Sequence, residues 1–260
     1  MAYKTALYSE SGGIATITLN RPDKRNAISY ELIDDVIAAL KQAAASDALV
    51  VILTGAGSAF CAGMDLDNLK QLLGRTPEQN LEDSRTMASL FRSLYDCPKP
   101  TIAAVNGHAI AGGTGLATLC DFTLAVPEAK FGYTEVRIGF VPGIVSSFLI
   151  GTVGEKRARE LLLTGRIFSA EEGHRFGLVT EIVPADQLMR RAHALAAELM
   201  QNSPNSVRTT KALLSGYTKD QLDRQMASAI RANAEVRQTA DFREGITSFL
   251  EKRKPKWTTR

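Results

Sequence analysis

The chain has 260 residues, of which 45% are hydrophobic and 23% charged, and its formal net charge is +3. This composition is typical of one large folded α/β domain, or of a core with a smaller appendage. The last ten residues carry a net charge of +4, which leaves −1 for the first 250. Because the positive charge is confined to one end, we expect no nucleic-acid partner. A solvated tail and a local phosphate contact remain open for its cations, which are Lys252, Arg253, Lys254, Lys256 and Arg260.

Cysteine and histidine spacing gives no sign of a bound metal. Cys61, Cys97 and Cys120 form no Cys-x-x-Cys pair, and the three histidines lie far apart. Such cysteines are typical of reduced thiols in a cytosol. The chain opens on no charged stretch with an apolar core, and no apolar run reaches the ~18 residues that span a membrane. We therefore expect a cytoplasmic protein with no metal, no permanently bound cofactor and no membrane contact.

The N-terminal residues predict a hairpin followed by a cationic loop. Residues 3–9 and 14–19 alternate apolar and polar side chains around a Ser-Gly-Gly sequence, which is a hairpin pattern. Residues 20–27 are polar and include Lys24 and Arg25. Solvation and an anion contact are both open for these cations.

Two short apolar runs, residues 49–53 and 101–105, each lead into a glycine-rich loop that precedes a predicted helix. Such runs are typical of strands that are buried on both faces. Glycine lets the main chain approach a ligand closely, and the free N–H groups at a helix start favour negative charge. The two loops, residues 54–66 and 106–115, could each direct one N–H at the same oxygen. This is the geometry that stabilises a thioester carbonyl as it becomes an enolate.

The second loop is also compatible with a purely structural role, because glycines between a strand and a helix are often only close-packing devices. Two phosphate-binding patterns fit it poorly. A dinucleotide fingerprint requires Gly-x-Gly-x-x-Gly, which Gly112, Gly113 and Gly115 do not form, and Asp121 lies too close to them. No Lys-Ser or Lys-Thr follows, so the pattern of a phosphate loop also fails.

Glu135 is the notable acid downstream of these loops. It is flanked by apolar residues and glycines within residues 131–143. A carboxylate in such surroundings should have a raised pKa and could transfer protons near neutral pH. An ion-paired structural acid is the alternative that the local sequence leaves open.

The sequence beyond residue 186 is predicted to be almost entirely helical. This change indicates a boundary near residue 200, with a core in residues 1–200 and a packing or oligomer-forming appendage in residues 201–260. The expected helices cover residues 186–201, 204–214, 219–236 and 239–251.

Short motifs along nearly the whole chain carry a family resemblance. They are Leu19-Asn20-Arg21-Pro22, Phe60-Cys61-Ala62-Gly63-Met64-Asp65-Leu66, Ala104-Val105-Asn106-Gly107, Gly112-Gly113, Cys120-Asp121, Phe131-Gly132, Glu135, Gly139, Pro142-Gly143, and the later residues 162–165, 170–172, 177–179 and 183–184. In this combination they resemble the crotonase superfamily, the enoyl-CoA hydratase/isomerase fold. The resemblance implies an α/β spiral of repeated ββα units and a C-terminal helical trimerisation region, with trimers often paired into hexamers.

The resemblance also implies roles for individual residues. It places the thioester oxygen between the backbone N–H groups of Met64 and Gly112, and the reacting water at the N–H of Gly143. Glu135 falls on the second of the two family carboxylates. Coenzyme A would enter as part of an acyl-CoA substrate, with basic tail residues of a neighbouring subunit assisting at its phosphates. The remaining substrate-binding positions are Lys24 and Arg25 for the phosphates, and Ala62, Gly63, Asp65 and Leu66 beside the adenine. Gly115 is also assigned to substrate binding.

The sequence departs from the family pattern at Gly115, where two-carboxylate hydratases carry their first acid. Losing one general acid–base partner typically costs about 10²- to 10⁴-fold in rate. Two reactions stay open: hydration of a 2-enoyl-CoA with one carboxylate, and Δ3,Δ2-isomerisation with Glu135 moving a proton between C2 and C4. Residues 134–139 with Gly115 also resemble bacterial hydratases that act on methylglutaconyl-CoA. Arg137 is then the candidate partner of an acidic acyl chain.

A catalytically silent CoA-binding or RNA-associated member of the family is the alternative from another class. It is motivated by Gly115 and by the basic tail. Replacing Glu135 by Gln separates the two classes, because an enzyme would lose turnover and keep its affinity for coenzyme A.

Overall fold

Two β-sheets form the centre of the protein, whose computed structural model describes residues 3–258. Two strand pairs, one in each sheet, are antiparallel, and the others are parallel. The larger sheet contains, in spatial order, β1 (Ala6–Ser11), β2 (Ile14–Leu19), β3 (Val50–Gly55), β5 (Thr101–Val105), β7 (Phe122–Ala125) and β10 (Glu181–Ile182). The smaller sheet contains β4 (Ala59–Cys61), β6 (His108–Ile110), β8 (Lys130–Gly132) and β9 (Phe168–Ser169).

Three successive parts of the chain repeat one arrangement, in which a strand of the larger sheet leads to a strand of the smaller sheet and then to a helix. The units are β3, β4 and α2 (Leu66–Leu72), then β5, β6 and α4 (Gly112–Leu119), then β7, β8 and α5 (Gly143–Thr164). Neighbouring units pair in parallel, so their loops follow strands that end at the same edge. The predicted spiral of ββα units is confirmed.

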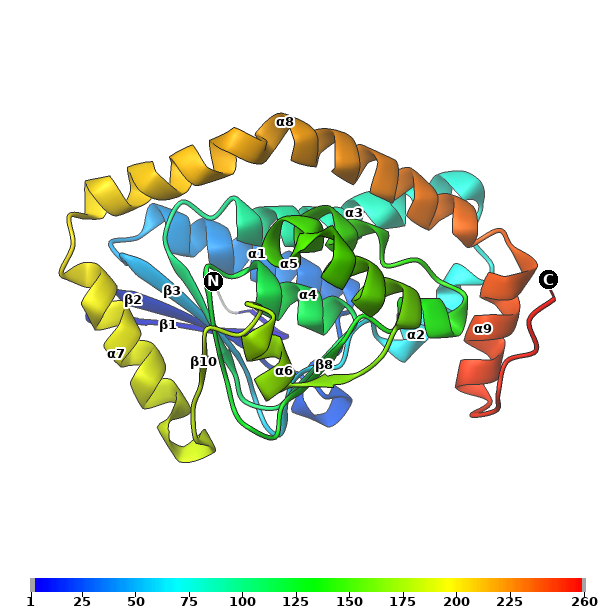
Figure 1. Ribbon diagram of the computed structural model, residues 1–260, viewed down its shortest axis with the longest axis horizontal. Helices are drawn as coiled ribbons and strands as arrows, with labels where there is room; N and C mark the ends of the chain where they lie inside the picture. Colours follow the sequence, from blue (N-terminus) through cyan, green and yellow to red (C-terminus); the bar gives the residue numbers. More distant parts are fainter. Residues whose placement is uncertain (1–2, 259–260) are drawn as a thin grey trace.

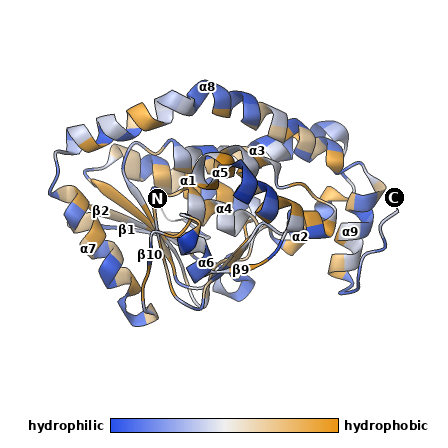
Figure 2. Cartoon of the chain, in the orientation of Figure 1, coloured by the Kyte–Doolittle hydropathy of each residue, from blue (hydrophilic) through white to orange (hydrophobic). Residues whose placement is uncertain are grey.

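The remaining helices cover the sheets and form the C-terminal part of the chain (Figure 1). Figure 2 shows that the central strands are mostly hydrophobic, whereas the long C-terminal helix has many hydrophilic turns. These helices are α1 (Tyr30–Ala45), α3 (Pro77–Tyr95), α6 (Ala170–Arg175), α7 (Leu188–Met200), α8 (Pro204–Val236) and α9 (Ala240–Leu250), with short 3-10 helices η1 (Pro22–Lys24), η2 (Glu135–Ile138) and η3 (Ala185–Gln187).

Local sequence explains the elements that were predicted with the right type. All five residues of β5 are buried, as are the first five residues of β3, which is why these strands are apolar apart from Thr101 and Thr54. The predicted hairpin is β1 and β2. It turns at Gly12 and Gly13, whose φ angles of 58° and 78° suit a two-residue hairpin turn.

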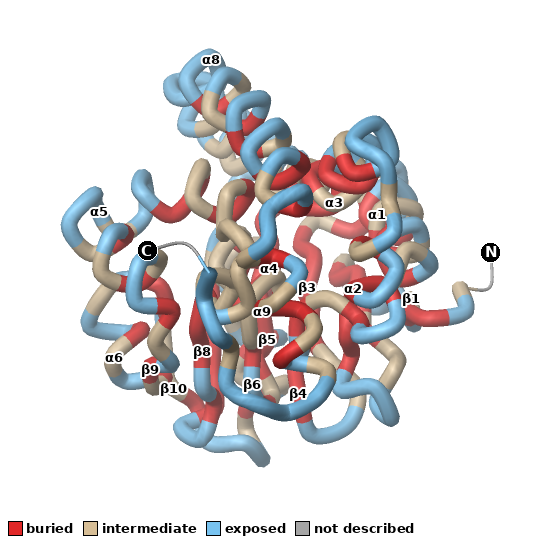
Figure 3. Tube along the Cα trace, turned by 90° about the vertical axis from the view of Figure 1, so that its right-hand side faces the viewer, coloured by how far each residue is buried: buried red, intermediate tan, exposed pale blue. Residues whose placement is uncertain are grey.

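The predicted break between residues 214 and 219 is wrong, because α8 is continuous over 33 residues. Gly216 lies inside it, and a glycine in a helix interior costs only about 1 kcal/mol relative to alanine. The helix arches over the molecule from α7 to α9 (Figure 1), and most residues of its first half are exposed (Figure 3). Neither α8 nor any other helix within residues 3–258 combines the length and apolarity needed to cross a membrane.

Candidate active site

A cavity of about 560 Å³ lies where the loops of the ββα units meet the C-terminal helices. Its volume is in the range of sites for small organic ligands. Polar and charged groups are few in its wall: Asp23, Lys24, Arg25, Asp65, Thr134, Glu135 and Asn233. Most other side chains are apolar, including Ile28, Leu69, Met87, Phe91, Ile110, Ile138, Phe140, Val141, Ile144, Val145 and Phe249.

Most of the residues singled out in the sequence meet at this cavity, although they are far apart along the chain. Gly63 and Gly115 are not among the lining residues and act instead through packing. His108 and Arg137 are also absent from the lining, and both are exposed. The predicted residues that line the cavity are Lys24, Arg25, Ala62, Met64, Asp65, Leu66, Gly112, Glu135 and Gly143.

The first glycine-rich loop presents Met64 to the cavity through a single parallel bridge to Ile28. The Ile28 N–H donates to Gly63 O at 2.7 Å, and the Asp65 N–H donates to Ile28 O at 3.0 Å. These two bonds bracket Met64, so its own N–H takes no part in the bridge. Gly63 has φ of +86°, and an ideal Cβ there would lie 3.0 Å from Ile110 O. Glycine is therefore required for the close approach to β6.

The second loop presents the first turn of α4, where Gly112 begins the helix. The N–H groups of a first helical turn have no partner inside the helix and are available to a ligand. Ala111, just before it, has φ of 51° and ψ of −121°, a backbone conformation that residues other than glycine rarely adopt. Its N–H donates to Gly132 O at 2.7 Å. An ideal Cβ on Gly113 would lie only 2.2 Å from Cys61 O, so α4 packs directly on β4.

Glu135 begins η2, and its Oε2 atom is buried without a hydrogen-bond partner. Burial disfavours the charged form and raises the pKa of Glu135 to about 7, against a smaller opposing contribution from its own backbone N–H. Among residues 3–258 Glu135 forms no ion pair. The predicted rise in pKa is present, and the alternative of an ion-paired structural acid is wrong.

Close backbone packing fixes η2 between α9 and the end of α5. An ideal Cβ would lie 2.3 Å from Asp241 O if built on Gly139, and 2.2 Å from Ile138 O if built on Gly245. On the other side, a Cβ on Gly165 would lie 2.9 Å from Val136 Cγ2. With three such approaches, the segment that carries Glu135 has little room to move.

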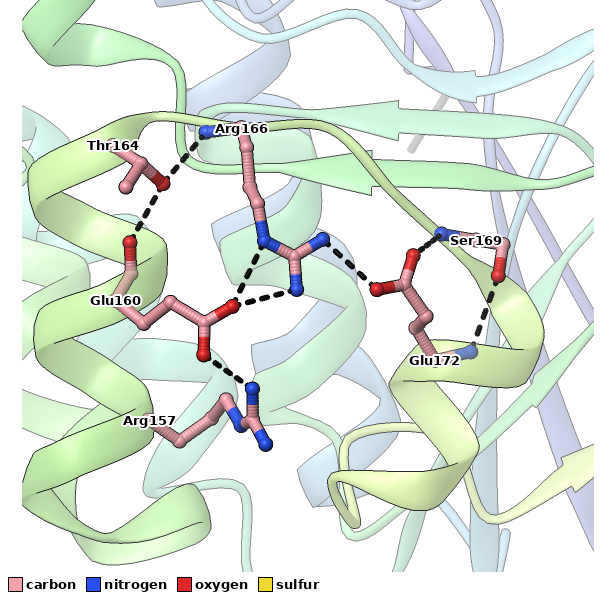
Figure 4. A network of polar contacts seen from close by, with 6 residues as sticks. All are labelled: Arg157, Glu160, Thr164, Arg166, Ser169 and Glu172. Carbon is pink, nitrogen blue, oxygen red and sulfur yellow. Dashed lines mark hydrogen bonds and ion pairs between the residues drawn. The ribbon is translucent and has the colours of Figure 1, made fainter.

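An ion-pair network holds the end of α5 in place (Figure 4). Arg166 Nη2 lies 2.8 Å from Glu160 Oε1 on α5, and Arg166 Nη1 lies 3.0 Å from Glu172 Oε1 on α6. Glu172 also closes a capping box with Ser169 at the start of α6. The network therefore ties the last turns of α5 to α6.

Gly115 lies beneath the cavity wall, where apolar side chains close in on it. An ideal Cβ on Gly115 would lie 2.7 Å from both Phe91 Cε1 and Val145 Cγ1. At the position that the resemblance assigns to the first family carboxylate, apolar side chains are packed so closely that Phe91 or Val145 would have to move to admit an acidic side chain. Of the three carboxylates in the cavity wall, Asp65 is held by Arg21 at 2.8 Å and Asp23 lies exposed on η1.

The cations at the mouth are placed by a buried asparagine. Asn26 Nδ2 donates to Ala56 O at 2.9 Å and to Ala59 O at 2.8 Å, which ties η1 to the first glycine-rich loop. Arg25 and Lys24 are both exposed, and Lys24 Nζ lies 3.9 Å from Asp67. The loop therefore holds two cations beside residues 62–66 and leaves them accessible.

Several residues of the site were not predicted from the sequence, among them Asn233, Phe249 and Ala111. Asn233 and Phe249 reach the cavity from α8 and α9, although residues 201–260 read only as a helical appendage. Neither belongs to a local motif, so only the path of the chain reveals them. The conformation of Ala111 also carries no sequence signal, because alanine is not a residue that favours positive φ.

Comparison with known proteins gives the family. A sequence profile of the enoyl-CoA hydratase/isomerase family matches residues 9–260. The chain belongs to the enoyl-CoA hydratase/isomerase family. A Thermus thermophilus protein provisionally named enoyl-CoA hydratase is 45% identical over 249 residues, covering 95% of this chain and 98% of that protein. The 1,2-epoxyphenylacetyl-CoA isomerase of Escherichia coli is 34% identical over 249 residues and covers 95% of each chain.

Solved structures of this enoyl-CoA hydratase/isomerase family share the fold. A crystal structure of an enoyl-CoA hydratase/isomerase from Pseudoalteromonas atlantica has a TM-score of 0.88 and 31% sequence identity, covering 98% of this chain and 100% of that one. The protein is therefore an enzyme of hydratase/isomerase type, and the family uses CoA thioester substrates. In the described residues no cluster of three or more His, Cys, Asp or Glu side chains is arranged to hold a metal ion.

Proposed function

We propose that this enzyme adds water to a 2-enoyl-CoA thioester and that Glu135 is its single proton carrier. The observation that carries the proposal is the isolated carboxylate of Glu135, which has a buried, unpartnered Oε2 and a pKa raised to about 7. It lines the same cavity as Met64 and Gly112. A proton carrier works best when its pKa lies near the working pH.

The reaction follows from these groups. The thioester oxygen accepts hydrogen bonds from the N–H groups of Met64 and Gly112, which stabilise the negative charge that forms on it. The water oxygen bonds to C3 while the Glu135 carboxylate takes one water proton, and the C2=C3 electrons move into the enolate. Glu135 then gives that proton to C2, which restores the carbonyl. One carboxylate thus supplies both proton transfers.

Coenzyme A binding is proposed at the mouth of the cavity. The adenine would lie along the main chain of residues 62–66, and the phosphates beside Lys24 and Arg25, which are exposed and clustered. Three further cations near the C-terminus are exposed, and they are proposed to contact the phosphates of coenzyme A bound to a neighbouring subunit: Lys252, Lys254 and Lys256. Arg253 forms an ion pair with Glu244 at 2.6 Å instead. Arg260 lies outside the described residues.

The acyl group is proposed to be uncharged. Phe91, Phe140 and Val145 are among the apolar residues of the inner wall, and the lining cations, Lys24 and Arg25, belong to the exposed loop. Arg137, the candidate partner of an acidic acyl chain, is exposed and does not line the cavity. A methylglutaconyl group would therefore bury a carboxylate without a cation, which is costly.

Isomerisation of a 3-enoyl-CoA is the second candidate. The packing of Phe91 and Val145 against Gly115 favours it, since one carboxylate suffices to move a proton between C4 and C2. One of the relatives, from E. coli, is named as an isomerase and not as a hydratase, which also supports this candidate.

A homotrimer, alone or paired into a hexamer, is the proposed assembly, with residues 201–260 contributing to it. Three large apolar side chains on the first half of α8 are exposed, with Leu213, Leu214 and Tyr217 at 52%, 63% and 77%. Exposed apolar groups gathered on one element are typical of protein interfaces. Light scattering on the purified protein tests this, and a monomer would contradict it.

A side-by-side assay on crotonyl-CoA, 3-methylglutaconyl-CoA and a 3-enoyl-CoA tests the proposed reaction. Loss of the conjugated double bond of crotonyl-CoA is the expected result. Gain of conjugation from the 3-enoyl substrate alone would replace hydration by isomerisation. Preference for the methylglutaconyl substrate would overturn the uncharged acyl group, and silence on all three would overturn the reaction itself.

A further inference from the structure

Asn233 is a second unpartnered polar group in the cavity wall. The residue is 4% exposed, and its Oδ1 atom is buried without a hydrogen-bond partner. Five buried side-chain polar atoms in the described residues lack a partner, and only those of Glu135 and Asn233 belong to residues that line this cavity. Leaving such an atom unpaired costs about 1–3 kcal/mol. Each of the two atoms is therefore available to a polar molecule bound in the cavity.

Asn233 lies directly against Gly143. An ideal Cβ on Gly143 would lie 3.1 Å from Asn233 Oδ1 and 3.2 Å from Ala229 O, one turn earlier on α8. Gly143 is the first residue of α5, and Pro142 before it offers no side-chain cap. Its N–H has no partner within the helix. A hydrogen-bond acceptor and a donor therefore stand side by side at one part of the wall.

Buried contacts anchor the end of α8, the helix that carries Asn233. Arg237 follows one turn later, directly after the last residue of α8, and its Nη1 lies 2.6 Å from Asp83 Oδ2 on α3. The two charged side chains are 1% and 0% exposed. The Arg237 guanidinium also lies 5.2 Å from the ring centroid of Phe140, which lines the cavity. The C-terminal end of α8 is thereby anchored both to α3 and to the cavity wall.

We propose that Asn233 holds the reacting water together with Gly143 and Glu135. The inference rests on the proposed hydration. The water accepts a hydrogen bond from the Gly143 N–H and donates one hydrogen to Asn233 Oδ1 and the other to Glu135. Its remaining lone pair is directed at C3. As the O–C3 bond forms, Glu135 takes its proton, while the carboxamide neither gains nor loses one. Asn233 thus supplies the second acceptor that Gly115 lacks, and it does so by positioning.

The test compares two reactions of the Asn233→Ala variant. Hydration of crotonyl-CoA needs the positioned water, whereas exchange of the C4 hydrogens of crotonyl-CoA with deuterium from D2O needs only Glu135 and the two N–H groups. Misplacing a reacting group typically costs about 10²-fold. We expect the kcat for hydration to fall by about that factor while C4 exchange, followed by NMR, stays within about threefold. Asn205→Ala, at an exposed position of the same helix, is the matched control.

Each outcome of this comparison either supports or overturns the role of Asn233. Unchanged hydration, or an equal loss of both reactions, overturns the role of Asn233 and leaves the proposed function standing. Partial recovery of hydration in Asn233→Asp, which restores an acceptor, supports it. If Asn233→Ala does not fold, the same pair of rates is measured in Asn233→Ser. Wild-type protein that exchanges C4 hydrogens but hydrates no 2-enoyl-CoA shows instead that the proposed hydration is wrong, and the assignment of Asn233 to the water falls with it.

Discussion

Gly115 faces the ring of Phe91 so closely that an ideal Cβ on the glycine would lie 2.7 Å from Phe91 Cε1. Val145 Cγ1 lies at the same distance. The absence of the first family carboxylate is therefore matched by its surroundings, which pack as an apolar wall. We therefore expect the chemistry at this site to proceed with Glu135 as the carboxylate beside the substrate.

Restoring the acid at position 115 is expected to destabilise the protein. Gly115→Glu adds volume to a filled core, which typically costs about 1–3 kcal/mol, and it also buries a carboxylate without a partner. Gly151→Glu is the control, because Gly151 on α5 is exposed and has open space around it. Urea unfolding should show a clear loss for the first variant only. Equal stability of the two variants would show that Phe91 and Val145 can move aside to accommodate the added side chain.

The sequence could predict the strands, the glycine-rich loops and Glu135 because their signals are local. A buried strand such as β5 is apolar at every position after Thr101, and an acid among apolar residues is visible by itself. The packing of Phe91 and Val145 against Gly115, and the position of Asn233 in the cavity wall, depend on contacts between segments that are distant in the sequence. The continuity of α8 through Gly216 was missed because helix packing outweighs a single unfavourable residue.

Glu135 is expected to lower stability at neutral and alkaline pH. Its pKa is about 7 in the folded protein and about 4.3 in an unfolded chain, so the folded state binds more protons between these values. The free energy of unfolding therefore falls as pH rises through this window. Glu135→Gln removes the effect and should be more stable than wild type by up to about 3.5 kcal/mol at pH 8, with little difference at pH 4. Urea titrations at both pH values check this, and a constant difference would contradict it.

The cations at the mouth are expected to act on binding alone. Replacing both Lys24 and Arg25 by Gln should raise the KM for crotonyl-CoA by about tenfold and leave kcat unchanged, because they lie outside the reacting centre. The effect should shrink at high salt. Lys41→Gln, at an exposed position of α1, is the control. A loss of kcat without a change in KM would place these cations elsewhere in the mechanism.

Ala111 is expected to tolerate glycine and to reject valine. At φ of 51° a β-branched side chain is strongly disfavoured, and such strain costs about 1–3 kcal/mol. Ala111→Val should lower the melting temperature and the kcat, because it shifts the peptide that carries the Gly112 N–H. Ala111→Gly should keep both near wild type. If valine were as active as glycine, the conformation of Ala111 would not set this N–H.

The central claim is that Glu135 carries the proton by itself. Its most direct test is the turnover of Glu135→Gln on the best of the three acyl-CoA substrates, beside Glu128→Gln at an exposed position. We predict that kcat falls by about 10²- to 10⁴-fold in the first variant only, with a similar KM, because the amide cannot accept the proton. A kcat within about threefold of wild type would contradict this role of Glu135.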